Sequence, residues 1–256
     1  MIKLSTVFFA LAFTLIACSN DDNIESLPED FRAIHLSFGT GSLGVLVNDL
    51  PLDGSIDFTN STDFVLAPEE TFNVKVSTTA SPDVFLIDVD FDPVDDPTTV
   101  YIFDEGVGLR NVRPIVLTNS FNTIDGSSIV RFLHANPDTF FTIDMYIGQS
   151  TEGCTDFSES TSYQVDYAEV ANGGQYLAPL LEGNYDICIT EADSPTALLG
   201  YLLDYSLEAE TKQTISFIEG DFNSFNSYGF HIISDISNAD AKVLRSELPL
   251  QLALQI

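Results

Sequence analysis

Hydrophobic and polar residues alternate along most of the chain beyond residue 30, with the period of two that is typical of half-buried β-strands. The clearest alternation lies in residues 72–77, 85–92 and 185–190. Turn-forming residues separate such segments about every ten positions, and no stretch of roughly twelve residues or more carries a helical hydrophobic stripe. The pattern predicts an all-β fold of antiparallel, immunoglobulin-like β-sandwiches.

The β pattern of the first half of the chain recurs in the second half. Phe72-Asn-Val-Lys-Val and Tyr185-Asp-Ile-Cys-Ile lie 113 residues apart, and a Ser-Pro pair follows both segments at the same distance. The simplest interpretation is two tandem β-sandwich domains, spanning residues 28–127 and 128–256. Chance similarity between β-strands is the alternative.

The second half resembles a known domain family. Residues 130–138, Val-Arg-Phe-Leu-His-Ala-Asn-Pro-Asp, and residues 143–148, Ile-Asp-Met-Tyr-Ile-Gly, resemble the opening of the DUF4397 domain, and residues 180–185 resemble its later Gly-x-Tyr strand. The first half is a more divergent copy, in which Leu-Ser-Phe follows His35. The resemblance implies a β-sandwich module, often in tandem, in exported bacterial proteins. It implies no particular activity.

The first seventeen residues have the features of a secretory signal peptide. Lys3 supplies a positive charge, and the apolar run that ends at Ala17 is shorter than the roughly 20 residues that a bilayer span needs. Leu15-Ile16-Ala17-Cys18 resembles the lipobox of bacterial lipoproteins, in which the cysteine is lipidated and becomes the first residue. We therefore expect lipidation at Cys18 and a polar tether over residues 18–27. An ordinary secretory signal ending near a cysteine is the alternative.

The chain is strongly acidic, with 39 Asp and Glu residues, 9 Lys and Arg residues and a formal charge of −30. Removal of residues 1–17 takes away Lys3 and no acid, so the charge becomes −31. Nucleic acids and anionic lipid head groups are poor partners for such a surface. We expect a membrane partner through the lipid anchor, a location in the cell envelope, in the outer membrane, and a protein or glycan ligand.

Two cysteines follow the lipobox, Cys154 and Cys188. An even pair in an oxidising compartment predicts a disulfide, which would tie the polar segment 151–156 to the face of the strand around residue 188. The alternatives are two unpaired thiols or a metal pair helped by nearby acids.

A run of acids suggests a cation site, because Ca²⁺ binds six to eight oxygen ligands. The candidate ligands are Asp88, Asp90, Asp92, Asp95 and Asp96. An EF-hand loop starting at Asp88 would, however, place Pro93 where that loop needs glycine. The first three also lie on the polar face of one alternating strand. We interpret the run as a solvated strand face with an acidic turn, and weak Ca²⁺ binding is the alternative.

Histidines and aromatic residues give two weaker signals. His35, His134 and His231 are too scattered to form a local zinc motif, so we expect His134 to form hydrogen bonds within the turn at residues 135–138. A turn-rich segment carries three rings that could bind a sugar or a protein, or else cap the core: Phe222, Phe225 and Tyr228.

No nucleophile elbow, zinc-protease motif or phosphate-binding loop occurs in the sequence. We therefore expect no enzymatic activity and no cofactor. The first hypothesis is a non-catalytic envelope module with a binding or structural role. The alternatives are an exported hydrolase acting on envelope or environmental polymers, and a weak Ca²⁺-binding adhesion module.

Overall fold

The computed structural model describes residues 31–66, 70–92, 96–105, 111–119, 126–150, 153–155, 157, 160–219, 228–235 and 242–245, with the backbone alone for Asp53 and residues 242–245. Regular structure in these residues consists of β-strands and three short 3-10 helices. The predicted all-β fold class is therefore confirmed. Within the described part of the chain, no helix has the length and apolar character that a membrane span requires.

The first half forms two sheets. One has the order β1-β6-β7, made of β1 (Phe31–His35), β6 (Thr98–Asp104) and β7 (Val112–Thr118). The other has the order β3-β2-β4-β5, made of β2 (Leu43–Val47), β3 (Leu50–Ile56), β4 (Phe72–Thr78) and β5 (Ser81–Phe91). The 3-10 helix η1 (Phe38–Thr40) links β1 to β2. Alternate residues of both sheets meet in one core that includes Phe31, Val74 and Val100.

The second half repeats this plan with additional strands. One sheet has the order β11-β8-β14-β15-β16, made of β8 (Ser127–Ala135), β11 (Leu180–Leu181), β14 (Lys212–Glu219), β15 (Tyr228–Ser234) and β16 (Lys242–Arg245). The other has the order β10-β9-β12-β13, made of β9 (Ile143–Gln149), β10 (Thr161–Val165), β12 (Gly183–Glu191) and β13 (Ser194–Leu207). The 3-10 helices are η2 (Pro137–Thr139) and η3 (Ala171–Gly174).

One feature departs from the antiparallel prediction, and it does so in both halves. β1 pairs with β6 in parallel, and β8 pairs with β14 in parallel. The other named strand pairs are antiparallel. The parallel pairs arise because β6 and β14 each follow a strand of the opposite sheet, β5 and β13, and not a hairpin within their own sheet.

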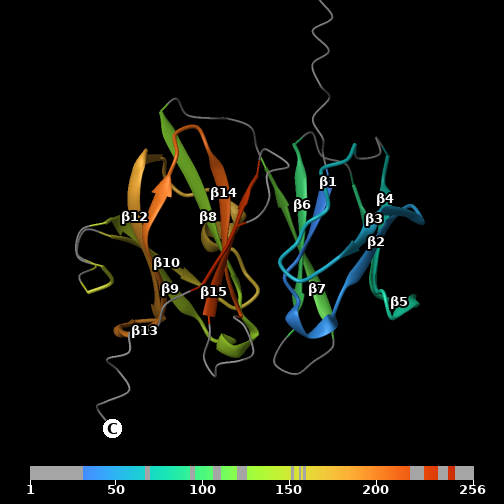
Figure 1. The fold of residues 1–256 in the computed structure, drawn as a ribbon, viewed down its shortest axis with the longest axis horizontal. Coiled ribbons are helices and arrows are strands. Elements are labelled where there is room, and N and C mark those ends of the chain that lie inside the picture. Colours follow the sequence, from blue (N-terminus) through green and yellow to red (C-terminus); the bar gives the residue numbers. More distant parts are fainter. Residues whose placement is uncertain are drawn as a thin grey trace, which may run out of the picture.

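The four sheets stack as four layers (Figure 1). The three-stranded sheet of the first half and the five-stranded sheet of the second face each other in the middle and enclose a third buried core, to which both halves contribute. It includes Ile34, Leu36, Tyr101, Phe103 and Leu117 from the first half and Leu133, Ala135, Ala168, Ile218 and Ile233 from the second. The middle sheets are therefore covered on both faces.

Double coverage explains why β1 and β6 are buried at every position. Along β1, Phe31 and Ala33 point into the core of their own half, while Ile34 points into the shared core. The predicted domains 28–127 and 128–256 thus each have a core, and the shared layer joins them. Whether either one folds alone stays a prediction.

Candidate functional site

A buried polar cluster lies between the two middle sheets, around Arg32 and Arg131. The two arginines occupy equivalent positions on β1 and β8, and their exposed fractions are 1% and 0%. Arg32 Nε donates to Thr99 Oγ1 at 3.1 Å, and Arg131 Nε donates to Thr214 Oγ1 at 2.9 Å. The repeated sequence therefore builds the same arginine–threonine contact twice.

Each arginine also reaches across to the other half. Arg32 Nη2 donates to Asp235 Oδ1 at 3.2 Å, and Arg131 Nη2 donates to Asn119 Oδ1 at 2.5 Å. Asn119 follows β7 and Asp235 follows β15, so these two residues are also equivalent. Arg131 Nη1 donates to the carbonyl of Thr118 at 3.0 Å. The contact between the halves is therefore pseudo-symmetric.

Asp235 is the centre of this cluster and is fully buried. It accepts hydrogen bonds from Tyr176 Oη at 2.9 Å, Thr214 Oγ1 at 2.8 Å and Tyr101 Oη at 3.4 Å, and its Oδ2 lies 3.4 Å from Arg131 Nη2. Burial and the Asp235 charge raise the pKa of Tyr101 to about 12. The Asp235 carboxylate is thus used to hold the two halves together.

His35 and His134 sit in equivalent buried turns and make equivalent hydrogen bonds. Nδ1 of His35 accepts from the Ser37 amide at 3.1 Å, and its Nε2 lies 2.7 Å from the Gly41 carbonyl. Nδ1 of His134 accepts from the Asn136 amide at 3.4 Å, and its Nε2 lies 2.7 Å from the Thr139 carbonyl.

These partners require a neutral ring with the proton on Nε2. Burial lowers the pKa of both histidines to about 4. The structure confirms the turn-forming interpretation of His134 and leaves neither ring as a base for chemistry at neutral pH.

His231 lies on β15 in the shared layer. Its Nε2 is 3.1 Å from the carbonyl of Thr59 in the other half, and burial lowers its pKa to about 4. The three histidines do not converge. Among the described residues, no group of three or more His, Cys, Asp or Glu side chains could hold a metal ion.

The acidic strand face lies on β5, where Asp88 and Asp90 are exposed, and continues to the exposed Asp92, which directly follows the strand. Asn73 Nδ2, on the neighbouring β4, donates to Asp88 Oδ1 and to Asp90 Oδ1, both at 2.9 Å. Thr71 Oγ1 donates to Asp92 Oδ1 at 2.7 Å. Hydrogen-bond donors on β4 and directly before it thus contact the carboxylates, as expected for a solvated strand face.

The other two acids of the run are separate from this face. Asp96 precedes β6, is half-buried, and its carbonyl accepts a hydrogen bond from Thr98 Oγ1 at 3.3 Å. Asp95 lies outside the described residues. The structure therefore does not bring the five candidate ligands together at one described site.

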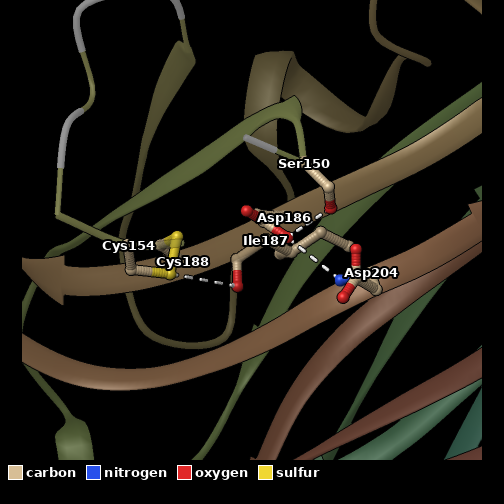
Figure 2. The surroundings of a disulfide bond; sticks show 6 residues. All are labelled: Ser150, Cys154, Asp186, Ile187, Cys188 and Asp204. Atoms are coloured by element: carbon tan, nitrogen blue, oxygen red, sulfur yellow. Dashed lines mark hydrogen bonds between the residues drawn. A yellow bond between two sulfur atoms is a disulfide. The ribbon is translucent and has the colours of Figure 1, made fainter. Parts of the chain in front are cut away.

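Cys154 and Cys188 form a disulfide, with their Cα atoms 5.8 Å apart (Figure 2), which confirms the predicted pairing. Cys188 lies on the outer face of β12 but is only 3% exposed, because the segment that carries Cys154 folds over that face. Phe157, on the same segment, stacks on Tyr146 of β9 with ring centroids 4.2 Å apart. The disulfide thus ties this segment to the face of β12, as the sequence predicted.

A hydrogen-bonded carboxylate supports the disulfide-linked segment. Asp186 Oδ1 accepts from Ser150 Oγ at 2.5 Å and from the Asp204 amide at 3.0 Å (Figure 2). Asp186 is 7% exposed. It joins the start of the segment to β13, so this carboxylate has a structural role.

Of the three predicted aromatic candidates, the structure describes only Tyr228. Phe222 and Phe225 lie outside the described residues. Tyr228 begins β15, is half-buried, and packs on Phe217 with ring centroids 5.3 Å apart, so it caps the core of the second half.

A pair of exposed rings, Phe140 and Phe141, was not predicted from the sequence, and the two are 68% and 39% exposed. They directly follow η2 and precede β9. Two adjacent phenylalanines between a turn and an alternating strand break the period of two, and this break was the available signal.

Comparisons with known proteins leave the function open. No protein-family model matches the chain, and no curated protein matches it. A family CBM26 module from Eubacterium rectale Amy13K, in complex with maltoheptaose, has 10% identity, a TM-score of 0.26 and coverage of 82% of this chain and 98% of that one. A protein described as a cell adhesion protein from Bacteroides ovatus ATCC 8483 has 8% identity, a TM-score of 0.21 and coverage of 86% and 98%. TM-scores this low carry no argument about what this chain does.

Proposed function

We propose that this chain is an exported, lipid-anchored and non-catalytic module that holds a binding surface at the cell envelope. The observation that carries the proposal is that side chains capable of catalysis are engaged in structural contacts. His35, His134 and His231 are buried, neutral and hydrogen-bonded to main-chain carbonyls, and Asp235 binds two arginines. These groups stabilise a stack of four sheets. Side chains used in this way suit a rigid scaffold better than an active site.

Cys18 carries the anchoring part of the proposal. The lipobox Leu15-Ile16-Ala17-Cys18 supports acylation of the thiol after cleavage of residues 1–17. Several acyl chains at about 0.8 kcal/mol for each buried CH₂ group would hold the protein durably on a membrane. The residue after the cysteine is Ser19 and not the aspartate that retains some lipoproteins in the inner membrane. This supports the outer membrane as the location.

Fractionation tests the anchor directly. The native chain should partition into the membrane fraction, and mass spectrometry of its first peptide should find an acylated Cys18. The Cys18→Ser variant should remain uncleaved or become soluble, while Ser19→Ala, one position further on, should behave as the native chain. An unmodified amino terminus beyond residue 18 would exclude lipidation.

The binding role is tested on the exported part, residues 28–256. Capture from envelope extracts should recover a specific partner that survives washing at moderate salt. Turnover of envelope polymers by the purified protein would instead support the hydrolase, and the proposal of a non-catalytic module would then be wrong.

A further inference from the structure

The turn after β8 presents Phe140 and Phe141 to solvent on a rigid support. His134 Nε2 lies 2.7 Å from the Thr139 carbonyl and 3.3 Å from the Phe141 carbonyl, so one buried ring holds the main chain on both sides of Phe140. The Asn136 side chain accepts from the Asp138 amide at 2.9 Å, and its Nδ2 donates to the Ile218 carbonyl at 3.2 Å. The main chain that carries the rings is therefore fixed in position before any partner arrives, which lowers the entropic cost of binding.

The equivalent turn of the first half shows that exposed rings are not needed to build this structure. There His35 Nε2 lies 2.7 Å from the Gly41 carbonyl, and Thr40 Oγ1 donates to the Ser37 carbonyl, as Thr139 Oγ1 does to the Asn136 carbonyl. The aromatic residue of that turn, Phe38, packs on Phe58 with ring centroids 5.1 Å apart. The same scaffold thus exists without exposed phenyl rings.

Two carboxylates belong to the elements that frame this turn, η2 and β14. Asp138 is exposed in η2, which packs against β14, and Glu219 is the half-buried last residue of that strand. Burial and the charges of Asp138 and Asp104 raise the pKa of Glu219 to about 7. A cation at this position would relieve the repulsion between these acids, whereas a neutral sugar would not.

Arg113, which acts on Tyr167 together with Asp104 and Glu219, is a nearby cation that is already engaged. It donates to the Ala168 carbonyl at 2.7 Å and lies over the Phe103 ring at 5.4 Å. Asp104 likewise accepts from Ser37 Oγ at 2.6 Å. Arg113 and Asp104 thus have partners other than Asp138, the acid two residues before Phe140, on a protein whose formal charge is −30.

We propose that the surface formed by Asp138, Phe140, Phe141 and Glu219, the Phe140 face, binds a basic segment of a partner protein. An arginine or lysine side chain would contact the exposed rings through a cation–π interaction and would pair with the carboxylates. The negative field of the whole protein would speed the approach of such a partner. This inference rests on the proposed function and deepens it by naming the chemistry of its partner.

The experiment measures binding of a fluorescent arginine-rich peptide to residues 28–256 by anisotropy at low and moderate salt. Phe140→Ser with Phe141→Ser should weaken binding by about tenfold. Asp138→Asn with Glu219→Gln should weaken it by a similar factor and reduce its salt dependence. Both double variants should keep the native melting temperature, because all four side chains are wholly or partly exposed.

Matched controls lie in the first half. Val84→Ser with Phe85→Ser removes two other exposed apolar residues, 62% and 39% exposed, beside the acids of β5. Asp63→Asn with Asp83→Asn removes two exposed charges elsewhere. Both controls should bind the peptide within about twofold of the native protein.

Two results would overturn the proposal: equal loss in the controls, or unchanged binding in both variants of the Phe140 face. Binding of a neutral oligosaccharide that depends on Phe140, without peptide binding, would also overturn it in favour of a glycan partner. Should the phenylalanine variant fail to fold, binding by the charge variant decides between these outcomes. Lipidation and membrane fractionation are independent of these results, so failure here leaves the proposed function separately testable.

Discussion

Arg32 Nη2 and Asp235 Oδ1 lie 3.2 Å apart, although 203 residues separate them along the chain. Both side chains are almost completely buried, with exposed fractions of 1% and 0%. Asp235 also lies 3.4 Å from Arg131, so one carboxylate serves an arginine of each half. This contact joins the two halves, and we expect it to couple their stabilities.

Asp235→Ala should destabilise the protein strongly, because it leaves two buried guanidinium groups without their shared carboxylate. Loss of one partner from a buried ion pair costs about 3–5 kcal/mol. Urea unfolding monitored by tyrosine fluorescence would measure the change. Lys75→Gln, which removes the exposed ion pair with Asp49, is the control and should shift the midpoint little. Equal effects of the two substitutions would argue against the central role of Asp235.

Asn119→Asp should stabilise the protein, because Arg131 would gain a carboxylate of its own in addition to the one that it shares with Arg32, which outweighs the lost donation from Asn119 Nδ2 to Thr99 Oγ1. Replacing a neutral acceptor of this hydrogen bond by a charged one should add about 1 kcal/mol to the free energy of unfolding. Asn119→Ala removes the acceptor and should lower that free energy. The melting temperature should therefore be highest for the Asp variant, intermediate for the native protein and lowest for the Ala variant. A lower melting temperature for the Asp variant than for the Ala variant would contradict the pseudo-symmetric interpretation.

Stability should fall between about pH 6.5 and pH 4, because three histidines are held neutral in the fold. Burial lowers the pKa values of His35, His134 and His231 to about 4, from 6.5 in the unfolded chain. The unfolded chain therefore binds protons first as the pH falls, and each histidine costs on the order of 3 kcal/mol by pH 4.

Unfolding midpoints between pH 7.5 and pH 4.5 would measure this loss. His134→Gln should be less stable at neutral pH and should show a shallower pH dependence than the native protein. A parallel pH profile for the variant would mean that His134 titrates normally in the fold.

Reduction of the Cys154–Cys188 disulfide should lower stability by about 3–4 kcal/mol, the value that the chain-entropy model gives for a loop of this size. Comparison of unfolding midpoints with and without a reductant would measure this loss. The double variant Cys154→Ser with Cys188→Ser should show the same loss without reductant. If reductant leaves the unfolding midpoint of the native protein unchanged, the bond has no such role.

Calcium should leave the melting temperature unchanged at millimolar concentrations. Asn73 Nδ2 donates to both Asp88 and Asp90, and a bound cation would have to displace that donor. Thermal melts with Ca²⁺ and with a chelator provide the measurement. A rise of several degrees that Asp88→Asn abolishes would instead support the weak Ca²⁺ site.

The sequence by itself was sufficient to predict the β pattern, the repeat and the Cys154–Cys188 pair, because each can be recognised from the residue types and their spacing along the chain. Alternation shows which residues of a strand, such as Val74 and Val76, face a core. The turn role of His134 could also be inferred, since its partners lie within seven residues of it.

Only the tertiary structure decided what covers the other face of each strand. Arg32 and Arg131 stand between apolar neighbours and would be placed in solvent by alternation, yet a second sheet buries them. Their partners Asp235 and Asn119 follow strands of the opposite halves, and no local sequence pattern indicates that these residues meet. The exposure of Phe140 was decided in the same way, because burial depends on neighbours that the chain brings together only when it folds.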